Sequence, residues 1–144
     1  MAELHPFFIH YPIALYTTAL IIEIIKLRFK SIPEYFSLIL IVLGAFSSLF
    51  ASFSGDLSLN ESKNIPGISD DLSRHELLGN ILTWIGIISA FTMVYLHLKK
   101  EQIIWLKWII LITLSIGILV TGYFGGQLVV DYGAGTKLIM DKQY

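Results

Sequence analysis

Four long apolar stretches, separated by polar segments, run along the chain. They cover residues 6–27, 35–53, 77–98 and 103–124. Each is close to the roughly 20 residues that an α-helix needs to cross the hydrocarbon core of a bilayer. Their apolar residues are continuous rather than alternating, which argues against the strands of a membrane β-barrel. The pattern therefore predicts four transmembrane helices.

The lengths of the connections predict how these helices are arranged. Residues 28–34 and 99–102 are short links, so the first and second helices, and the third and fourth, should form antiparallel hairpins. Residues 54–76 form the one long connection, which is polar and which we expect to be a loop. The sequence thus predicts an all-α fold, an integral membrane up-down four-helix bundle, as a single domain over residues 1–144.

The distribution of lysine and arginine predicts the orientation in the membrane. Six of these residues flank the two short links, and the other four are spread over far more residues on the opposite side. Because short cytoplasmic loops are enriched in Lys and Arg, we expect both termini and the long connection to lie outside. In a bacterium this means the inner membrane with periplasmic termini. The six are Lys26, Arg28, Lys30, Lys99, Lys100 and Lys107.

Composition narrows the possible chemistry. Hydrophobic residues make up 55% of the chain and charged residues 15%, well below the roughly one quarter of a typical soluble domain. The net charge of −1 offers no basic surface for nucleic acid. The chain has no cysteine, which excludes thiolate metal sites, cysteine-ligated iron–sulfur clusters and covalent c-type haem. A cofactor would therefore be bound non-covalently, with histidine as its first ligand.

The residues that could bind a cofactor gather at the predicted outer helix ends. His5 and His10 open the first helix, Asp56 follows the second, and His75 precedes the third. Glycines close the fourth helix at residues 122–126. The inner end offers only an interfacial set of charges, including Glu23 and Lys26, which we expect to form a surface pair. This asymmetry predicts a functional site at the outer end.

A b-type haem is the first hypothesis for this site. Non-covalent haem needs axial ligands and a slot of low polarity, which four-helix bundles can build between facing helices. We expect His10 and His75 as the axial ligands, Gly79 and Gly126 beside the ring, and Arg74 at the propionates. The protein would then transfer single electrons, with a quinone or other membrane redox subunits and an outer redox protein as partners.

Two other functions fit the same residues. The first is a divalent metal ion held without haem by His10, His75, His5 and Asp56, since imidazole and carboxylate suit such ions.

The second is a non-catalytic subunit of a membrane complex, in contact with lipid and other helices. Small residues recur every four positions, at Gly44, Ser48 and Ser52 and at Gly122 and Gly126, and such rows let membrane helices pack closely or form oligomers. The chain shows no nucleophile–base pair and no phosphate-binding loop, so the sequence does not predict a stand-alone enzyme.

Two segments, one at the start of the chain and one near its end, resemble a known family. The opening Leu4-His5-Pro6-Phe7-Phe8-Ile9-His10-Tyr11-Pro12-Ile13-Ala14-Leu15 and the glycine-rich end at 122–135 are similar to domain of unknown function 2231. Ser54-Gly55-Asp56 and residues 75–79 resemble it more weakly. The resemblance implies a four-helix bacterial membrane domain and a cluster of important positions, but no activity. The chain departs from the family pattern at Tyr132, where members often have histidine.

Overall fold

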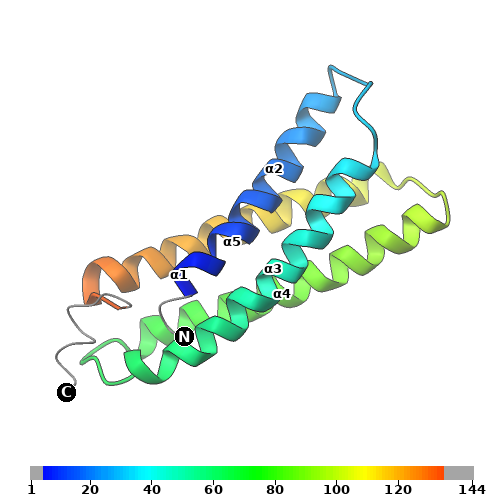
Figure 1. Cartoon of the computed structure of the whole chain (residues 1–144). Helices are drawn as coiled ribbons and strands as arrows, with labels where there is room; N and C mark the ends of the chain where they lie inside the picture. Colours follow the sequence, from blue (N-terminus) through cyan, green and yellow to red (C-terminus); the bar gives the residue numbers. More distant parts are fainter. Residues whose placement is uncertain (1–4, 135–144) are drawn as a thin grey trace.

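The chain folds into helices joined by short turns. A computed structural model describes residues 5–134, and all side chains within them except those of residues 59–61. The helices are α1 (His5–Phe8), α2 (His10–Lys26), α3 (Tyr35–Ser62), α4 (Ser69–Leu98) and α5 (Ile104–Tyr132) (Figure 1). The described part contains no strand. Taking α1 and α2 together, four spans are long and apolar enough to cross a membrane, which confirms the predicted all-α membrane bundle.

The four spans form an up-down bundle. Successive spans run in opposite directions, so the starts of α1 and α4 and the ends of α3 and α5 lie at one end of the bundle (Figure 1). We call this the outer end, and the opposite one the inner end. The main contacts are between α2 and α3, α3 and α4, α4 and α5, and α5 and α2, which closes the bundle into a ring.

The helices extend beyond the apolar stretches at the outer end. α3 continues to Ser62 and α4 begins at Ser69, so most of the expected 54–76 loop is helical and only residues 63–68 connect them. α5 likewise continues to Tyr132, where Gly133 ends it with φ of 67° and its N–H donates to the carbonyl of Val129. Hydropathy detects the part of a helix that lies in lipid, whereas a helix ends where its capping residues stand.

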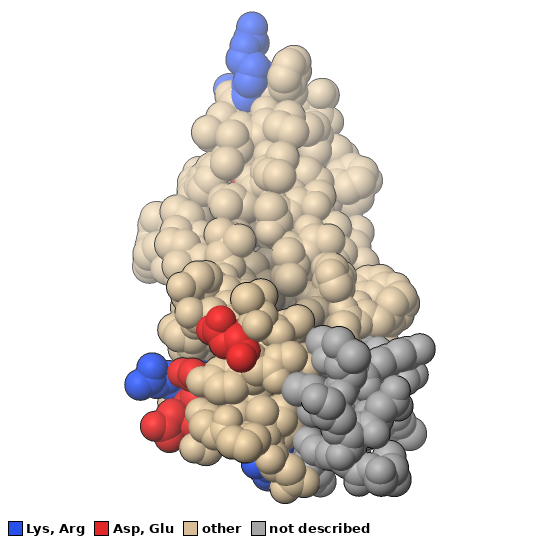
Figure 2. Space-filling model, turned by 90° about the vertical axis from the view of Figure 1, so that its left-hand side faces the viewer, with Lys and Arg blue, Asp and Glu red and all other residues tan. Residues whose placement is uncertain are grey.

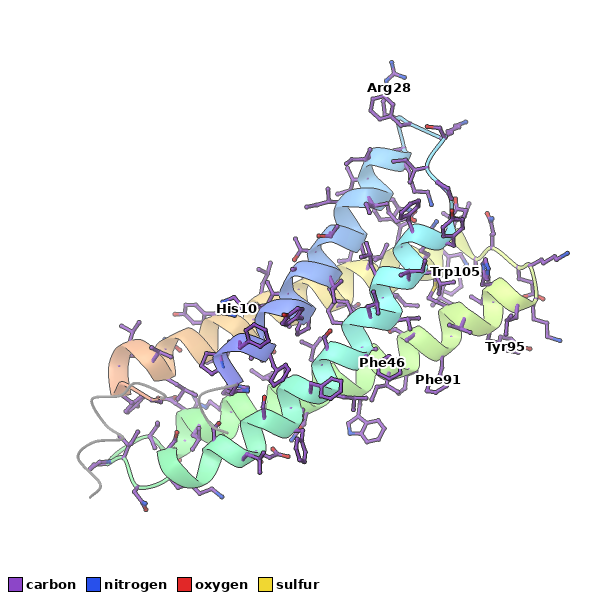
Figure 3. All side chains as sticks on the ribbon, viewed as in Figure 1. His10, Arg28, Phe46, Phe91, Tyr95 and Trp105 are labelled. Carbon is purple, nitrogen blue, oxygen red and sulfur yellow. The ribbon has the colours of Figure 1, made fainter. Side chains whose placement is uncertain are left out.

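The outer surface of the bundle is apolar along most of its length. Figure 2 shows a broad band of uncharged residues between lysine and arginine at one end and a mixed group of charges at the other. Large side chains such as Phe46, Phe91 and Trp105 project away from the bundle, at 60%, 74% and 65% exposure (Figure 3). In water such a surface would be an aggregation hazard, but in a bilayer it faces lipid.

Glycine and serine rows line the inside of the bundle. The fully buried Tyr16 lies against Gly44 and Gly86, where a Cβ atom would collide with its ring or hydroxyl. Ser48 is buried and lies 3.3 Å from the Tyr16 hydroxyl, within hydrogen-bond distance. Ser52 bonds to α4 instead of facing out. This row therefore packs helices of the same chain against one another, as small residues in membrane helices commonly do.

A cluster of ion pairs closes the inner end. Glu23 is 2.8 Å from both Lys26 and Lys107, and Glu34 is 2.8 Å from Lys26 and 3.0 Å from Lys107. The hydroxyl of Ser37 also donates to Glu23. Glu23 and Lys26 do form the expected pair, but their side chains are 4% and 7% exposed, so the prediction that the pair lies at the surface is wrong. Both residues lie on the inward side of α2, where α5 supplies the second lysine.

The same cluster fixes the charge of Glu34 in the first turn between helices. Partial burial alone would raise the pKa of this carboxyl, but the hydrogen bonds and charges of Lys26 and Lys107 outweigh burial and lower the pKa. Glu34 therefore stays ionised beside the two ammonium groups.

Candidate functional site

His5 begins the first span and turns its ring toward α3. Its Nδ1 lies 3.1 Å from the carbonyl oxygen of Ala51 and 3.1 Å from the hydroxyl of Ser54. A carbonyl can only accept, so Nδ1 carries the proton and donates it. In a neutral imidazole this leaves Nε2 with a free lone pair, which is the state that a metal ligand requires.

His75 is the seventh residue of α4 and is held in a similar way. Its Nδ1 lies 3.2 Å from the carbonyl oxygen of Thr121 in α5. The same argument places the proton on Nδ1 and the lone pair on Nε2. A backbone carbonyl bonded to the second nitrogen is the usual way in which proteins orient a metal-ligating histidine.

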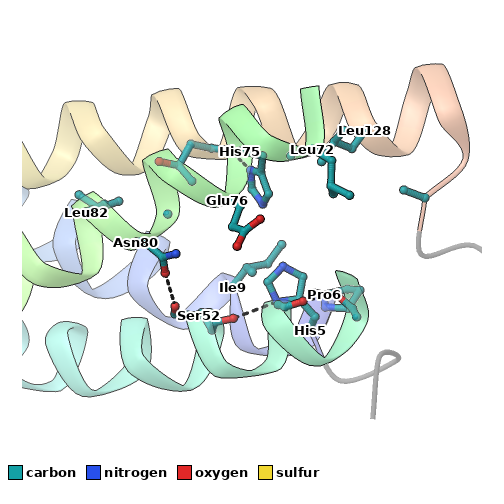
Figure 4. Close-up of a pocket in the computed structure, with 18 of the residues that line it drawn as sticks. His5, Pro6, Ile9, Ser52, Leu72, His75, Glu76, Asn80, Leu82 and Leu128 are labelled. Atoms are coloured by element: carbon teal, nitrogen blue, oxygen red, sulfur yellow. Dashed lines mark hydrogen bonds between the residues drawn. The ribbon is translucent and has the colours of Figure 1, made fainter. Parts of the chain in front are cut away.

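The two imidazoles stand across from each other at the outer end of the bundle. Their ring centroids are 6.5 Å apart and their planes are inclined by 76° (Figure 4). Two imidazoles that share one metal ion, with metal–nitrogen bonds of about 2.0–2.1 Å, have centroids roughly 6 Å apart. The separation of His5 and His75 therefore suits one shared metal centre.

Glycines allow each ring to lie against a neighbouring helix. A Cβ atom at Gly55 would be 3.1 Å from Cε1 of His5, and one at Gly125 would be 2.9 Å from Cε1 of His75. Contacts this short would displace the ring, so only glycine fits at these positions without a shift.

A cavity of about 350 Å³ surrounds the two histidines. This volume falls within the range of about 300–1,000 Å³ that is usual for cofactor and ligand sites. Its lining is largely apolar and comes from α1 to α5, with Pro12, Leu82 and Ile118 among the residues deepest in the bundle. Such a lining supplies the low polarity that a flat organic cofactor needs.

Polar groups stand at defined points of the cavity. Ser52 on α3 donates a hydrogen bond of 2.8 Å to the side-chain oxygen of Asn80 on α4 (Figure 4). Asp56 and Glu76 also line the cavity, and both are exposed. Neither Asn80 nor Glu76 was among the expected site residues. A single amide within the apolar run 77–98 was the available signal for Asn80, because polar side chains in membrane spans usually face the bundle interior.

Two of the expected residues lie elsewhere. His10 is exposed, and its Nδ1 donates to the carbonyl of Pro6 one turn earlier (Figure 3). The structure does not bring His10 and His75 together. Arg74 has a side chain that is 67% exposed, and it faces Asp71 at 3.9 Å outside the cavity.

The other expected residues do meet. His5, His75, Asp56, Gly79 and Gly126 all line the cavity. A Cβ atom at Gly126 would find nothing within 4 Å, and one at Gly79 would only touch a methyl group of Thr121 at 3.9 Å. These two glycines therefore leave open space on the cavity side of α4 and α5.

Few side chains in the described site could bind a bare metal ion. Within residues 5–134 no group of three His, Asp or Glu side chains is placed to hold such an ion. Tyr132 also takes no part in the cavity, because its hydroxyl donates to Asp71 at 2.7 Å. The two histidines are thus the strongest candidate ligands in the described site.

Comparison with known proteins identifies the family. The model of a family described as "Predicted membrane protein (DUF2231)" matches residues 2–138, nearly the whole chain. The chain therefore belongs to this family, which confirms the resemblance of its opening and closing segments. Comparisons with curated proteins and with solved structures give no match.

Proposed function

We propose that this member of the DUF2231 family is a membrane electron-transfer protein that binds one b-type haem between His5 and His75. The observation that carries the proposal is the pair of facing imidazoles, 6.5 Å apart, each with Nδ1 at a backbone carbonyl. His5 replaces His10 as the partner of His75, because His10 is exposed and does not line the cavity.

The number of ligands favours haem over a bare metal ion. A haem supplies four nitrogens of its own to its iron, so His5 and His75 would be enough to complete the coordination. A bare Zn²⁺ ion usually needs three or four protein ligands. Only two imidazoles converge in the described cavity, and the carboxylates of Asp56 and Glu76 do not form a metal-binding group with them.

The surroundings also suit a haem. The cofactor supplies one-electron chemistry when it is bound, and the chain orients it and controls its access to water. Open space beside Gly79 and Gly126 would admit the edge of the ring, and the apolar lining would keep its iron away from solvent. Donor and acceptor would be a quinone or membrane redox subunit on one side and an outer redox protein on the other.

We also propose a bacterial inner-membrane location with the outer end in the periplasm. Lysine and arginine flank the two turns at the inner end, at residues 26–30 and 99–107, as the positive-inside rule requires of a cytoplasmic face. The site would then meet partners of the periplasmic side.

The colour of the purified protein tests the proposal. Protein from haem-replete cells should show a Soret band and a pyridine haemochrome of one b haem per chain. The band should be lost in His5→Ala and in His75→Ala, whereas the matched control His10→Ala should keep it. A colourless wild-type preparation would overturn the proposal, and loss of the band in His10→Ala alone would restore the first choice of ligand.

A further inference from the structure

His5 and His75 each contact partners that lie at the same distances along the chain from the histidine. The carbonyl that accepts from His5 is 46 residues later, at Ala51, and the carbonyl that accepts from His75 is also 46 residues later, at Thr121. The glycine under each ring follows its histidine by 50 residues in both cases. A shift of 70 residues therefore converts one set into the other.

The same shift applies to the whole bundle. Residues 35–62 of α3 become 105–132, and α5 covers Ile104–Tyr132. Helix neighbours are also preserved when the two hairpins are exchanged, that is, when 70 is added to the residue numbers of the first and subtracted from those of the second. The α2–α3 and α3–α4 contacts then become α4–α5 and α5–α2 contacts, which are the other two of the ring. Buried positions coincide as well, in the pairs Ala19 and Ser89, Lys26 and Leu96, Ile41 and Leu111, Ala45 and Ser115, and Ser48 and Ile118.

These correspondences relate the two hairpins by a pseudo-two-fold axis along the bundle. Both hairpins start at the outer end and run in the same sense, which is the arrangement of parallel repeats in a membrane protein. His5 and His75 occupy equivalent positions on either side of this axis. A cofactor held between them would receive one equivalent histidine from each repeat.

We infer that the chain is built from two structural repeats, and that each repeat contributes one ligand-holding arm, made of a histidine, a carbonyl and a glycine, to a single cofactor site. The inference rests on the proposed function for the identity of the cofactor, a b-type haem. It assigns a role to Gly55 and Gly125 as positioning residues, which act on the cofactor through the rings of His5 and His75.

The glycines position the rings because a larger residue at either place would force the histidine ring to shift. A methyl group at Gly55 or Gly125 would stand 3.1 or 2.9 Å from the Cε1 atom of its histidine. The ring would have to tilt, which would stretch the bond from Nδ1 to the carbonyl and move Nε2 away from the axis. Because groups that orient a metal ligand usually matter ten- to hundredfold for metal affinity, we expect a loss of this size from each variant.

The test compares Gly55→Ala and Gly125→Ala with Val130→Ala, all in the full chain. Val130 lies on the same helix as Gly125, but its side chain is 83% exposed and does not line the cavity. Haem affinity should fall about ten- to hundredfold in the first two variants and stay within about twofold in the control. The midpoint potential of the remaining haem should also move only in the first two.

A second measurement does not depend on haem. In haem-free protein labelled with ¹⁵N-histidine, Gly55→Ala should shift the imidazole signals of His5 and leave those of His75, and Gly125→Ala should do the reverse. Unmoved signals in both variants would overturn the assignment. A wild-type protein that binds no haem would overturn the proposed function, while the histidine signals would still decide whether the two arms are equivalent.

A pair of variants that removes a ring covers the case in which an added methyl group prevents folding. Free imidazole should restore the Soret band in His5→Gly and in His75→Gly, because each change leaves a space the size of the lost ring against a glycine. Rescue of one variant but not the other would contradict equivalent arms.

Discussion

The ion-pair cluster at the inner end allows a quantitative prediction. Lys107→Met removes the ammonium group that α5 contributes to Glu23 and Glu34 and keeps a chain of similar length. Glu23 is 4% exposed, so the carboxylate left behind cannot be stabilised by water. Removing one partner of a buried pair costs about 3–5 kcal/mol. Glu23 retains Lys26 and Ser37, so we expect a loss somewhat below this range, about 2–3 kcal/mol.

The free energy of unfolding can be measured in mixed detergent micelles by titration with sodium dodecyl sulfate. Trp105 and Trp108 stand on either side of Lys107 in the sequence and provide the fluorescence signal. Lys30→Met is the matched control, because Lys30 lies at the same end of the bundle and is exposed. Its unfolding free energy should stay within about 0.5 kcal/mol of the wild type.

A double-mutant cycle separates the ion pair from the loss of packing. Glu23→Gln combined with Lys107→Met removes one charge of each sign and leaves Lys26 paired with Glu34. The double variant should be more stable than the sum of the single changes predicts, by about 1–3 kcal/mol. Additive free energies, or equal stability of Lys107→Met and Lys30→Met, would refute the reasoning.

Three further outcomes are expected. Gly44→Ala should lower the unfolding free energy by about 1–3 kcal/mol, because its Cβ atom would stand 2.7 Å from Cδ1 of the buried Tyr16, whereas Gly122→Ala, with nothing within 4 Å, should not. The pKa of Glu34 is lowered in the folded state. Its contribution to the free energy of unfolding is therefore complete above its unfolded pKa of about 4.3 and is lost as the pH falls through the lower folded value. Below pH of about 4, the unfolding free energy of Glu34→Gln should accordingly fall less steeply with falling pH than that of the wild type. Because the chain has no cysteine, Asn64→Cys in the α3–α4 turn should react with an impermeant thiol reagent from outside intact cells, and Ser31→Cys only after lysis; the reverse pattern would invert the proposed topology.

The four spans could be predicted from sequence because the bilayer imposes a length on apolar helices. Their ends could not, because α3, α4 and α5 extend as helices beyond the apolar stretches, and α5, for example, ends only at the left-handed Gly133. The position of the candidate site at the outer end could also be predicted from the sequence. Histidine, aspartate and glycine stand at four helix ends there, and an up-down bundle brings those ends together.

The choice between His5 and His10 depended on the rotation of the first span, which hydropathy does not give. Five residues turn an ideal helix by about 140°, so only one of the two histidines can face the bundle interior. The polar residues of α2 carry the missing information. Tyr16, Glu23 and Lys26 are all buried, and the alternating spacing of three and four residues that joins them leads back to His5 and misses His10.

Tyr16, Glu23 and Lys26 form one inward-facing stripe along the first span, and this stripe connects the two ends of the bundle. At the inner end Glu23 pairs with Lys107 of α5 and Lys26 pairs with Glu34, and in the middle Tyr16 lies between Gly44 and Gly86. Each of these contacts holds α2 in one rotation, because any other would leave a buried charge or hydroxyl in lipid. The short α1 is joined to the start of α2 by one helical turn, in which the N–H of Ile9 donates to the carbonyl of His5. The rotation of α2 therefore also turns the His5 ring toward α3 and His75. The polar residues that look most costly in this membrane protein therefore determine which histidine faces the cavity.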